Sequence, residues 1–223
     1  MKKLCIVVII IACMSCTHDK AVQLPEISHA DITEINDVSA AYLFYDETQS
    51  DSVELNRKNL ISTTNWLVNV DKRLTLKQAI PYIQFLQEKK QNSSHKNEAA
   101  KNYFTCHNTS INNLGFIEFT QVVYEENIKD DILKFKDSFK IKSINFSLKG
   151  DIFILNPEAE PFVSKSSISE LKNDILALDV SGNMLSLVFN NTLSFQDYIT
   201  YKSALLNIEL KHAEISNIEF LDN

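Results

Sequence analysis

The chain has 223 residues, of which 29 are acidic and 22 basic, so its formal net charge is −7. This excess of acids excludes the clustered Lys and Arg that nucleic-acid binding requires, and it disfavours attachment to anionic lipid by charge alone. The length is sufficient for one domain or for two small ones, each with its own core.

The N-terminus begins with two basic residues, Lys2 and Lys3, which precede the apolar run Leu4–Met14. The run is shorter than the roughly 20 residues that cross a bilayer as a helix. A basic start, a short apolar run and a small residue before the end of the segment are typical of a signal peptide. We therefore expect residues 1–15 to be a lipoprotein signal peptide.

A small residue directly before a cysteine, with polar residues after it, resembles the lipobox of bacterial lipoproteins. The resemblance implies that Cys16 becomes the lipidated first residue, with acyl groups such as palmitate, and attaches the chain to a membrane. The residue after Cys16 is not Asp, which resembles the pattern of lipoproteins sorted to the outer membrane. We expect a periplasm-facing protein there. The periplasmic face of the inner membrane stays open, as does an ordinary secretory signal cut nearby.

Cys106 is the single candidate free thiol once the signal peptide is removed and Cys16 carries lipid. One thiol cannot form an internal disulfide or a multi-cysteine zinc site. His107 beside it could suggest a nucleophile and its base, but neighbours on a strand point to opposite faces, which favours a small buried Cys106. Phosphate-loop, GxSxG and HExxH motifs are missing. We therefore expect no enzyme, cofactor or metal, and keep a Cys-dependent envelope hydrolase as an alternative.

Residues 16–38 are polar, without a sustained apolar period, and are expected to be a tether. The aromatic content of Ala40–Tyr45 predicts the first strand. Residues 53–55 alternate briefly, which fits a second strand or a short helix. The tripeptide Asp-Ser-Val around Ser52 resembles an O-glycosylation signal of bacterial periplasmic proteins, so Ser52 is a candidate for glycosylation.

The chain contains an internal repeat at an offset of 119 residues, between Trp66–Gln87 and Leu185–Leu206. Each copy has an apolar run, a polar turn and a hydroxyl residue followed three positions later by an acid or amide. These pairs, Thr75 with Gln78 and Ser194 with Asp197, are typical of a capping box at a helix start. Each copy is thus predicted to be a strand that leads into a helix. Pro81 predicts a kink in the first helix, or a start nearer Ile80.

The same tripeptide, Ile-Glu-Phe, follows both copies and predicts a closing strand at Ile218–Phe220. On this alignment the first copy carries an insertion of 18 residues near 88–106, which is either a solvated loop or a contact surface. We expect the closing strand to be a sheet edge. Its residues Ile215, Ile218 and Phe220 are then candidates for binding an extended partner segment, or the same strand of a second copy.

The second half of the chain gives clear local patterns. Apolar spacing over residues 128–139 predicts an amphipathic helix that joins two modules. Alternation on both sides of Lys149-Gly150 predicts a β-hairpin. Ser167 with Glu170 predicts another capping box and a helix behind it, and Gly182-Asn183 predicts the turn into the second copy of the repeat.

This order of hairpin, helix, strand, helix and closing strand resembles the periplasmic domain of the ExbD/TolR family over Ile144–Phe220. Through the repeat, the resemblance reaches Trp66–Phe119. It implies an α+β fold of two related small α/β modules, over residues 39–125 and 126–223. Family members are stators of proton-driven motors with an Asp in an N-terminal transmembrane helix. Leu4–Met14 has no acid, so no proton path is implied here.

What remains of the family resemblance implies a binder of cell-wall material or of extended segments of partner proteins. We therefore expect a non-catalytic cell-envelope lipoprotein. Its expected partners are an envelope protein or the cell wall, with the membrane attached through the lipid, no nucleic acid, and a homodimer through the edge strand as an option. A structural spacer without a ligand is the third hypothesis.

Overall fold

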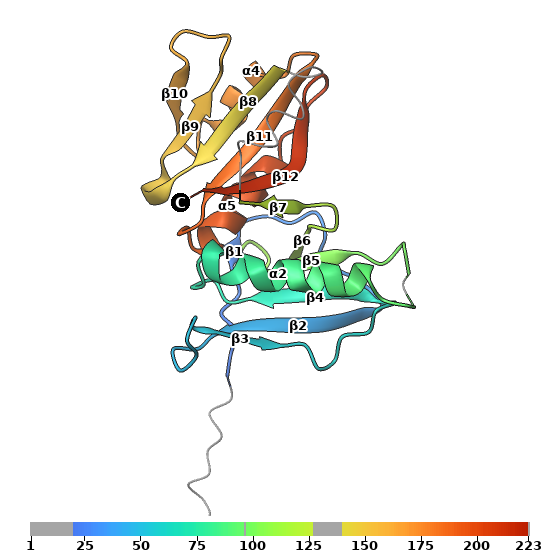
Figure 1. Cartoon of the computed structure of the whole chain (residues 1–223). Helices are drawn as coiled ribbons and strands as arrows, with labels where there is room; N and C mark the ends of the chain where they lie inside the picture. Colours follow the sequence, from blue (N-terminus) through green and yellow to red (C-terminus); the bar gives the residue numbers. More distant parts are fainter. Residues whose placement is uncertain (1–19, 96, 127–139, 223) are drawn as a thin grey trace, which may run out of the picture.

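The computed structural model describes residues 20–95, 97–126 and 140–222, which form two mixed β-sheets with helices packed against them (Figure 1). Each sheet has six strands within the described residues. The predicted α+β fold with two sheet modules is therefore confirmed. The predicted signal peptide, Cys16 and the predicted helix over 128–139 lie outside the described residues.

The first sheet has the strand order β1-β5-β4-β2-β3, with β6 also paired to β5. Its elements are β1 (Glu26–Ile27), β2 (Val38–Tyr45), β3 (Val53–Asn56), β4 (Asn65–Val70), α2 (Leu76–Gln91), β5 (Asn102–Asn108) and β6 (Asn113–Glu118). β2, β4, β5 and β1 run parallel, whereas β3 is antiparallel to β2 and β6 to β5. β3 therefore stands at one edge of the sheet.

The second sheet has the order β10-β9-β8-β11-β12-β7. Its elements are β7 (Val123–Glu125), β8 (Lys140–Phe146), the 3-10 turn η1 (Leu148–Gly150), β9 (Ile152–Leu155), β10 (Val163–Ser166), α4 (Leu171–Ala177), β11 (Asn183–Asn190), α5 (Phe195–Leu206) and β12 (Glu214–Asp222). β8, β11, β12 and β7 run parallel, and β8, β9 and β10 are joined antiparallel. The predicted hairpin is confirmed.

The internal repeat corresponds to β4–α2 in the first module and β11–α5 in the second. Both predicted capping boxes are present, because Thr75 accepts a hydrogen bond from Gln78 N and Ser194 accepts one from Asp197 N. The strands β5, β4, β2 and β3 follow one another in the same order and direction as β12, β11, β8 and β9. The two modules thus share one arrangement of strands.

The counterpart of β12 is β5, so the predicted equivalence of the two Ile-Glu-Phe segments is wrong. In the first module the chain runs 36 positions from Trp66 to its pairing partner on β5, Asn102, and in the second it runs 30 from Leu185 to Ile215. Beyond a bulge in the second sheet, Leu187 pairs with Glu219 after 32 positions, whereas Val68 pairs with Phe104 after 36. The insertion is therefore four to six residues and not 18. Ile117 and Glu118 belong to β6, an added strand antiparallel to β5, which a shared tripeptide could not reveal.

The two modules are joined where their repeated helices begin. Backbone N–H groups in the first turn of each helix donate to carbonyl groups in the turn before the other helix, which satisfies donors that a helix start leaves unpaired. The bonds are Leu76 N to Leu193 O (2.9 Å), Lys77 N to Asn191 O (2.8 Å), Phe195 N to Leu74 O (2.6 Å) and Gln196 N to Lys72 O (3.2 Å). The bonds donated by Leu76 and Lys77 correspond, at the 119-residue offset, to those donated by Phe195 and Gln196. An approximate twofold axis therefore relates the modules.

Aromatic side chains continue the core from one module into the other. The ring of Phe104 on β5 stacks on Phe119 at 3.8 Å between centroids and meets Phe195 of α5 edge-on at 5.2 Å. Tyr198 Oη of α5 donates to Glu219 Oε2 at 2.7 Å and lies 3.1 Å from Tyr124 Oη, all inside the protein. These contacts, with the reciprocal backbone bonds, favour one folded body over two independent ones.

Two predicted boundaries are wrong. Residues 20–38, in the predicted tether, are part of the fold, since β1 pairs with β5 and Ile27 is buried. β7 falls within the predicted first module but pairs with β12 of the second sheet. Burial of Tyr124 and its contact with Tyr198 account for this placement, and neither feature is visible in a local pattern.

The start of α4 differs from the prediction, whereas α2 begins where its capping box predicts. α4 begins at Leu171 after Glu170 with no side-chain cap, and Ser167 Oγ instead lies 2.9 Å from Ser169 Oγ and 3.4 Å from Glu170 Oε2. α2 begins at Leu76 and includes Pro81, so the alternative start near Ile80 is wrong.

Candidate functional site

The predicted partner-binding edge on β12 is wrong. β12 lies between β11 and β7, and Ile218 and Phe220 are opposite residues of β7. Ile215 is opposite Leu185 of β11, and Phe220 is buried. The position that an extended partner would take beside Ile218 is thus filled by β7, which lies about 95 residues earlier in the same chain. A pattern confined to Ile215–Phe220 could not indicate this.

An open sheet edge does exist in the first module, at β3. Leu55 is opposite Leu43 of β2, and the carbonyl oxygen of Leu43 accepts a bond from Asp71 N, on the β4 side. In an antiparallel pair, residues that do not exchange bonds direct their N–H and C=O away from each other. The backbone groups of Leu55 therefore face outward along the edge, where they can pair with an added strand.

The second module shows how that edge can be filled. Its counterpart of β3 is β9, and β10 pairs antiparallel along the outer edge of β9. The strands also pair in the same register in both sheets. In the first sheet Leu43 of β2 is opposite both Val70 and Leu55. In the second sheet Phe146 of β8 is opposite both Phe189 and Ile152, so Ile152 takes the place of Leu55. Ile152 is opposite Ser166 of β10. An extended segment thus already occupies, in the second module, the place that is open beside Leu55.

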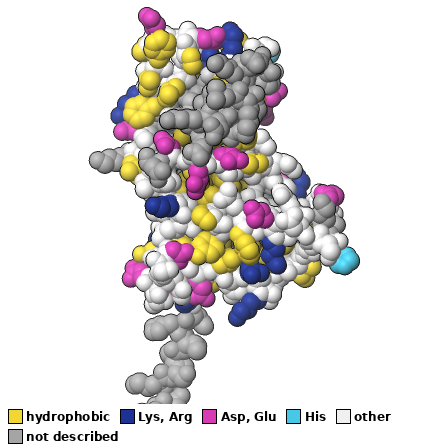
Figure 2. Space-filling model, in the orientation of Figure 1, with side chains coloured by type: hydrophobic (Ala, Val, Ile, Leu, Met, Phe, Trp, Pro, Cys, Tyr) yellow, Lys and Arg dark blue, Asp and Glu magenta, His cyan; other side chains and the backbone are white. Residues whose placement is uncertain are grey.

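Two adjoining hollows of about 510 and 670 Å³ follow the open edge of β3 and continue between α2 and the segment that joins β3 to β4. We call them the β3 groove. Its lining residues are Glu54, Leu55, Asn56, Arg57, Lys58, Leu60, Ser62, Trp66, Phe85, Glu88, Lys89, Asn92, Ser93 and Ser94. The volumes are in the range of ligand-binding clefts. Figure 2 shows Lys and Arg side chains beside hydrophobic ones in the region of β3 and α2.

The β3 groove combines apolar surface with positive charge. The guanidinium carbon of Arg57 lies 4.9 Å from the ring centroid of Phe85, which is 41% exposed. Lys58 and Lys89 add two more cations. Of the lining acids, Glu54 is paired with Lys20. With three basic side chains against the two acids Glu54 and Glu88, the groove has a net positive charge in an acidic chain, which suits an extended segment with acidic side chains.

Lys90 is buried behind the groove, with its ammonium group 5.3 Å from the centroid of the Trp66 ring. Its Nζ donates to Lys101 O at 2.8 Å and to Asn102 Oδ1 at 3.0 Å. Burial lowers the pKa of Lys90 to about 8, because a charged amine loses hydration there. These bonds join the end of α2 to the start of β5 and hold the wall of the groove that Trp66 forms.

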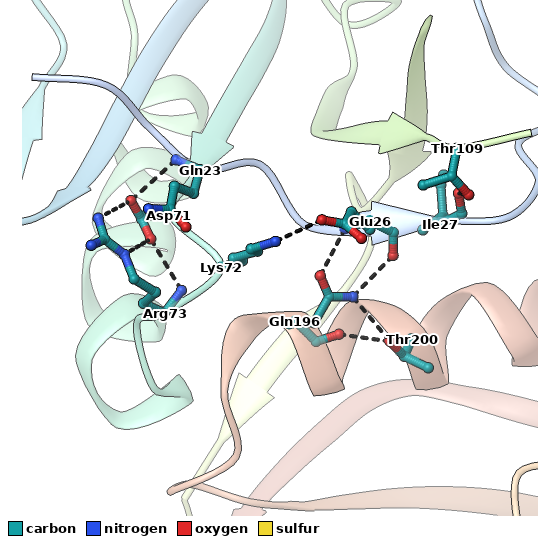
Figure 3. A network of polar contacts seen from close by, with 9 residues as sticks. All are labelled: Gln23, Glu26, Ile27, Asp71, Lys72, Arg73, Thr109, Gln196 and Thr200. Atoms are coloured by element: carbon teal, nitrogen blue, oxygen red, sulfur yellow. Dashed lines mark hydrogen bonds and ion pairs between the residues drawn. The ribbon is translucent and has the colours of Figure 1, made fainter. Parts of the chain in front are cut away.

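Residues 20–27, which end with β1, are bound to both modules, and we call them the N-terminal strap (Figure 3). The side-chain amide of Gln196 on α5 makes two hydrogen bonds to the backbone of Glu26. It accepts from Glu26 N at 2.8 Å and donates to Glu26 O at 2.9 Å. Lys72 donates its backbone N–H to Gln23 O at 2.7 Å, and its Nζ lies 2.6 Å from Glu26 Oε1. The strap therefore crosses the junction of the modules as a fixed part of the fold.

The start of the strap is bound beside β3. Lys20 Nζ lies 2.5 Å from Asp46 Oδ2 and also pairs with Glu54 of β3. The Lys20 ammonium beside Asp46 holds the pKa of that carboxyl well below its usual range. Further along, Asp71 is fully buried and accepts bonds from Gln23 N and from Arg73.

The other predicted residues lie apart from the groove. Cys106 on β5 is fully buried, and burial raises the pKa of its thiol to about 12, so it is in no position to act as a nucleophile. His107 is half-buried and its ring contacts Asn112 Oδ1 at 3.1 Å. Ser52 is half-buried with a φ of 60° in the turn before β3, and its glycosylation stays a prediction. The alternative of a Cys106-dependent hydrolase therefore loses its nucleophile.

No group of three or more His, Cys, Asp or Glu in the described ranges is placed to hold a metal ion. Likewise, none of the helices that the structure describes is long and apolar enough to span a bilayer. Comparisons with family models, curated proteins and solved structures give no match to this chain. The resemblance to the ExbD/TolR periplasmic domain therefore stays a prediction.

Sequence reasoning missed the β3 groove, although some signals for it are present. Arg57, Lys58 and Lys89 are basic residues close to the predicted second strand and to the end of the first repeated helix. Their approach to one another depends on the antiparallel return of β3 beside β2, with α2 packed next to it. The prediction of a contact surface near residues 88–106 stays open. Five residues of that range line the groove, namely Glu88, Lys89, Asn92, Ser93 and Ser94.

Proposed function

We propose that this protein is a non-catalytic cell-envelope lipoprotein that binds an extended segment of a partner protein by strand addition along β3. The lipid is on Cys16, and the folded body faces the periplasm from the outer membrane. The single observation that carries the proposal is the contrast between the modules, since β10 covers the outer edge of β9 while the equivalent edge of β3 is open.

Strand addition supplies both affinity and selectivity at this place. The outward N–H and C=O of Leu55 pair with the backbone of the added segment, independently of its sequence. Side chains that point into the β3 groove then meet Arg57 and Lys89, which favour acids. By analogy with β10 on β9, the added segment runs antiparallel to β3 and is opposite Leu55 and Asn56, the last two residues of β3.

Charge argues against a second copy of this chain as the occupant. In a symmetric dimer, β3 of each copy would pair with β3 of the other. The single acid on β3 is Glu54, which is already paired with Lys20, so a second β3 offers no free acidic side chain to the basic residues of the groove. A homodimer through β3 is therefore the less favoured arrangement, and it is one outcome of the test below.

The test is site-specific photo-crosslinking in cells, with a photoreactive amino acid at Asn59 beside the end of β3. The control position is Lys172 on α4, which is also exposed but lies in the other module. We expect one discrete cross-linked partner from Asn59 and none from Lys172. A product with twice the mass of the chain would indicate the homodimer, and absence of any product would favour a spacer without a ligand.

Variants of the groove separate strand addition from general surface contact. Leu55→Pro removes the outward N–H while an edge strand tolerates Pro at such a position, so we expect cross-linking to fall at least fivefold. The matched control Leu55→Val keeps the N–H and should retain most of the product. Arg57→Glu with Lys89→Glu should also reduce it fivefold or more, whereas Lys211→Glu on the second module should not. Equal yields in all of these variants would contradict the proposal.

A further inference from the structure

The N-terminal strap fixes the place at which the chain leaves the folded body. From Lys20 onward it is held by side chains and backbone, first at Asp46 and Glu54 and then at Asp71, Lys72 and Gln196. Lys20 pairs with β3 itself, through Glu54. The point of departure therefore lies next to the β3 groove, on the module that carries it, and α4 of the second module lies at the far end of the molecule (Figure 1).

Only four residue steps separate Lys20 from Cys16. A chain extends by at most about 3.6 Å per residue, so the lipidated residue can lie no more than about 14 Å from Lys20. β3 has four residues, which corresponds to about 13 Å along the strand. The β3 end of the groove, where Lys20 pairs with Glu54, is thus held within a few tens of ångströms of the bilayer surface once Cys16 carries lipid.

We infer that the occupant of the β3 groove is a membrane-proximal segment, an extended acidic stretch that lies close to the bilayer in another membrane-attached envelope protein. This inference rests on the proposed function. A short attachment restricts the groove to a layer next to the membrane, and a partner attached to the same membrane meets it at a high effective concentration. A segment borne by a freely diffusing periplasmic protein gains nothing from this restriction.

The first test measures the orientation of the lipidated full-length protein in liposomes of a neutral lipid. A fluorophore is attached through Lys58→Cys in the groove or through Lys172→Cys on α4, and a quencher is carried on the lipid headgroups. Cys106 is buried and does not compete for the label. We expect at least threefold stronger quenching at position 58 than at 172. A flexible Gly/Ser insertion of about 20 residues between Asp19 and Lys20 should remove the difference. Equal quenching in the unextended protein would overturn the inference, provided that its intact mass shows the lipid.

The second test applies the same insertion to cross-linking from Asn59 in cells. If the partner segment is membrane-proximal, the extended protein should lose at least fivefold in cross-linked product. An unchanged yield would show that the segment reaches the groove at any height, which overturns the inference and leaves strand addition intact. By contrast, loss of the product in Leu55→Pro with the normal attachment tests the groove alone, so the two proposals fail separately.

Discussion

Lys90 shows how burial of one charged group affects the stability of this fold. Its hydrogen-bond acceptors are a backbone carbonyl and an amide oxygen, so neither carries a charge that would compensate for lost hydration. The folded protein accordingly lowers the pKa of Lys90 from 10.5 to about 8. The charged amine is stabilised less in the folded state than in the unfolded chain.

This difference predicts a pH dependence with a definite sign. Below pH 8 the amine is protonated in both states, and the cost of burying its charge is fully present. Between pH 8 and 10.5 the unfolded chain binds more protons than the folded one, so stability rises with pH. We expect the free energy of unfolding to increase by about 1–3 kcal/mol over that interval relative to Lys90→Met, which does not titrate. Urea unfolding at both pH values measures it, and parallel curves for the two proteins would contradict the assignment.

Cys106 is a single residue whose burial the sequence does predict. Its sequence context predicts a small buried side chain, and the structure places it at the centre of the first sheet with a thiol pKa raised to about 12 by burial. The contrast between buried Cys106 and half-buried His107 follows from the alternation of side chains on a strand. What the sequence could not indicate is that its strand, β5, is paired on both sides, by β6 along one edge and by β4 and β1 along the other.

At the scale of elements, the two capping boxes do more than begin their helices. Thr75 and Ser194 form an isolated β-bridge with each other, so the cap of each helix lies against the cap of the other. Loss of one cap therefore loosens a turn that both modules use. Their contributions to stability should be coupled, although each pair of capping bonds is local in sequence.

We expect Thr75→Ala and Ser194→Ala each to lower the free energy of unfolding by about 1 kcal/mol. The double variant should lose less than the sum by about 0.5 kcal/mol or more, because contacting residues in one network are not independent. Ser167→Ala is the matched control, since Ser167 does not cap α4, and it should change stability by less than about 0.5 kcal/mol. Denaturant unfolding of the four proteins measures the cycle, and strict additivity would refute the coupling.

The elements that the sequence predicts are those set by residues close together in the chain. The repeat, the two caps and the hairpin of the second module depend on residues within a few positions of one another, and the sequence indicates them correctly. β1 and β7 have only two and three residues, and each is held by a strand far away in the chain. β10 has the sequence Val-Ser-Lys-Ser with no apolar face. The sheet edges, and with them the β3 groove, depend on these short strands and were therefore placed wrongly.

At the scale of the whole molecule, the approximate twofold axis places two copies of one arrangement in a single chain. A dimer of identical modules would have identical edges, so both would be open or both covered. Joining the copies covalently removes this requirement. Here β10 fills the edge in one copy, and the other copy keeps the β3 groove.

The consequence concerns valency. A symmetric pair with two open edges could hold two partner segments and link them into networks. The part of this chain that the structure describes offers one such groove, so the protein should form closed one-to-one complexes. A synthetic peptide of the cross-linked segment should saturate the protein at one peptide per chain in native mass spectrometry and in calorimetry. A second equivalent site would require β10 to leave β9, and the resulting two-to-one complex would show that the filled edge is exchangeable. With β10 in place, each copy of the protein ends an assembly and does not extend it.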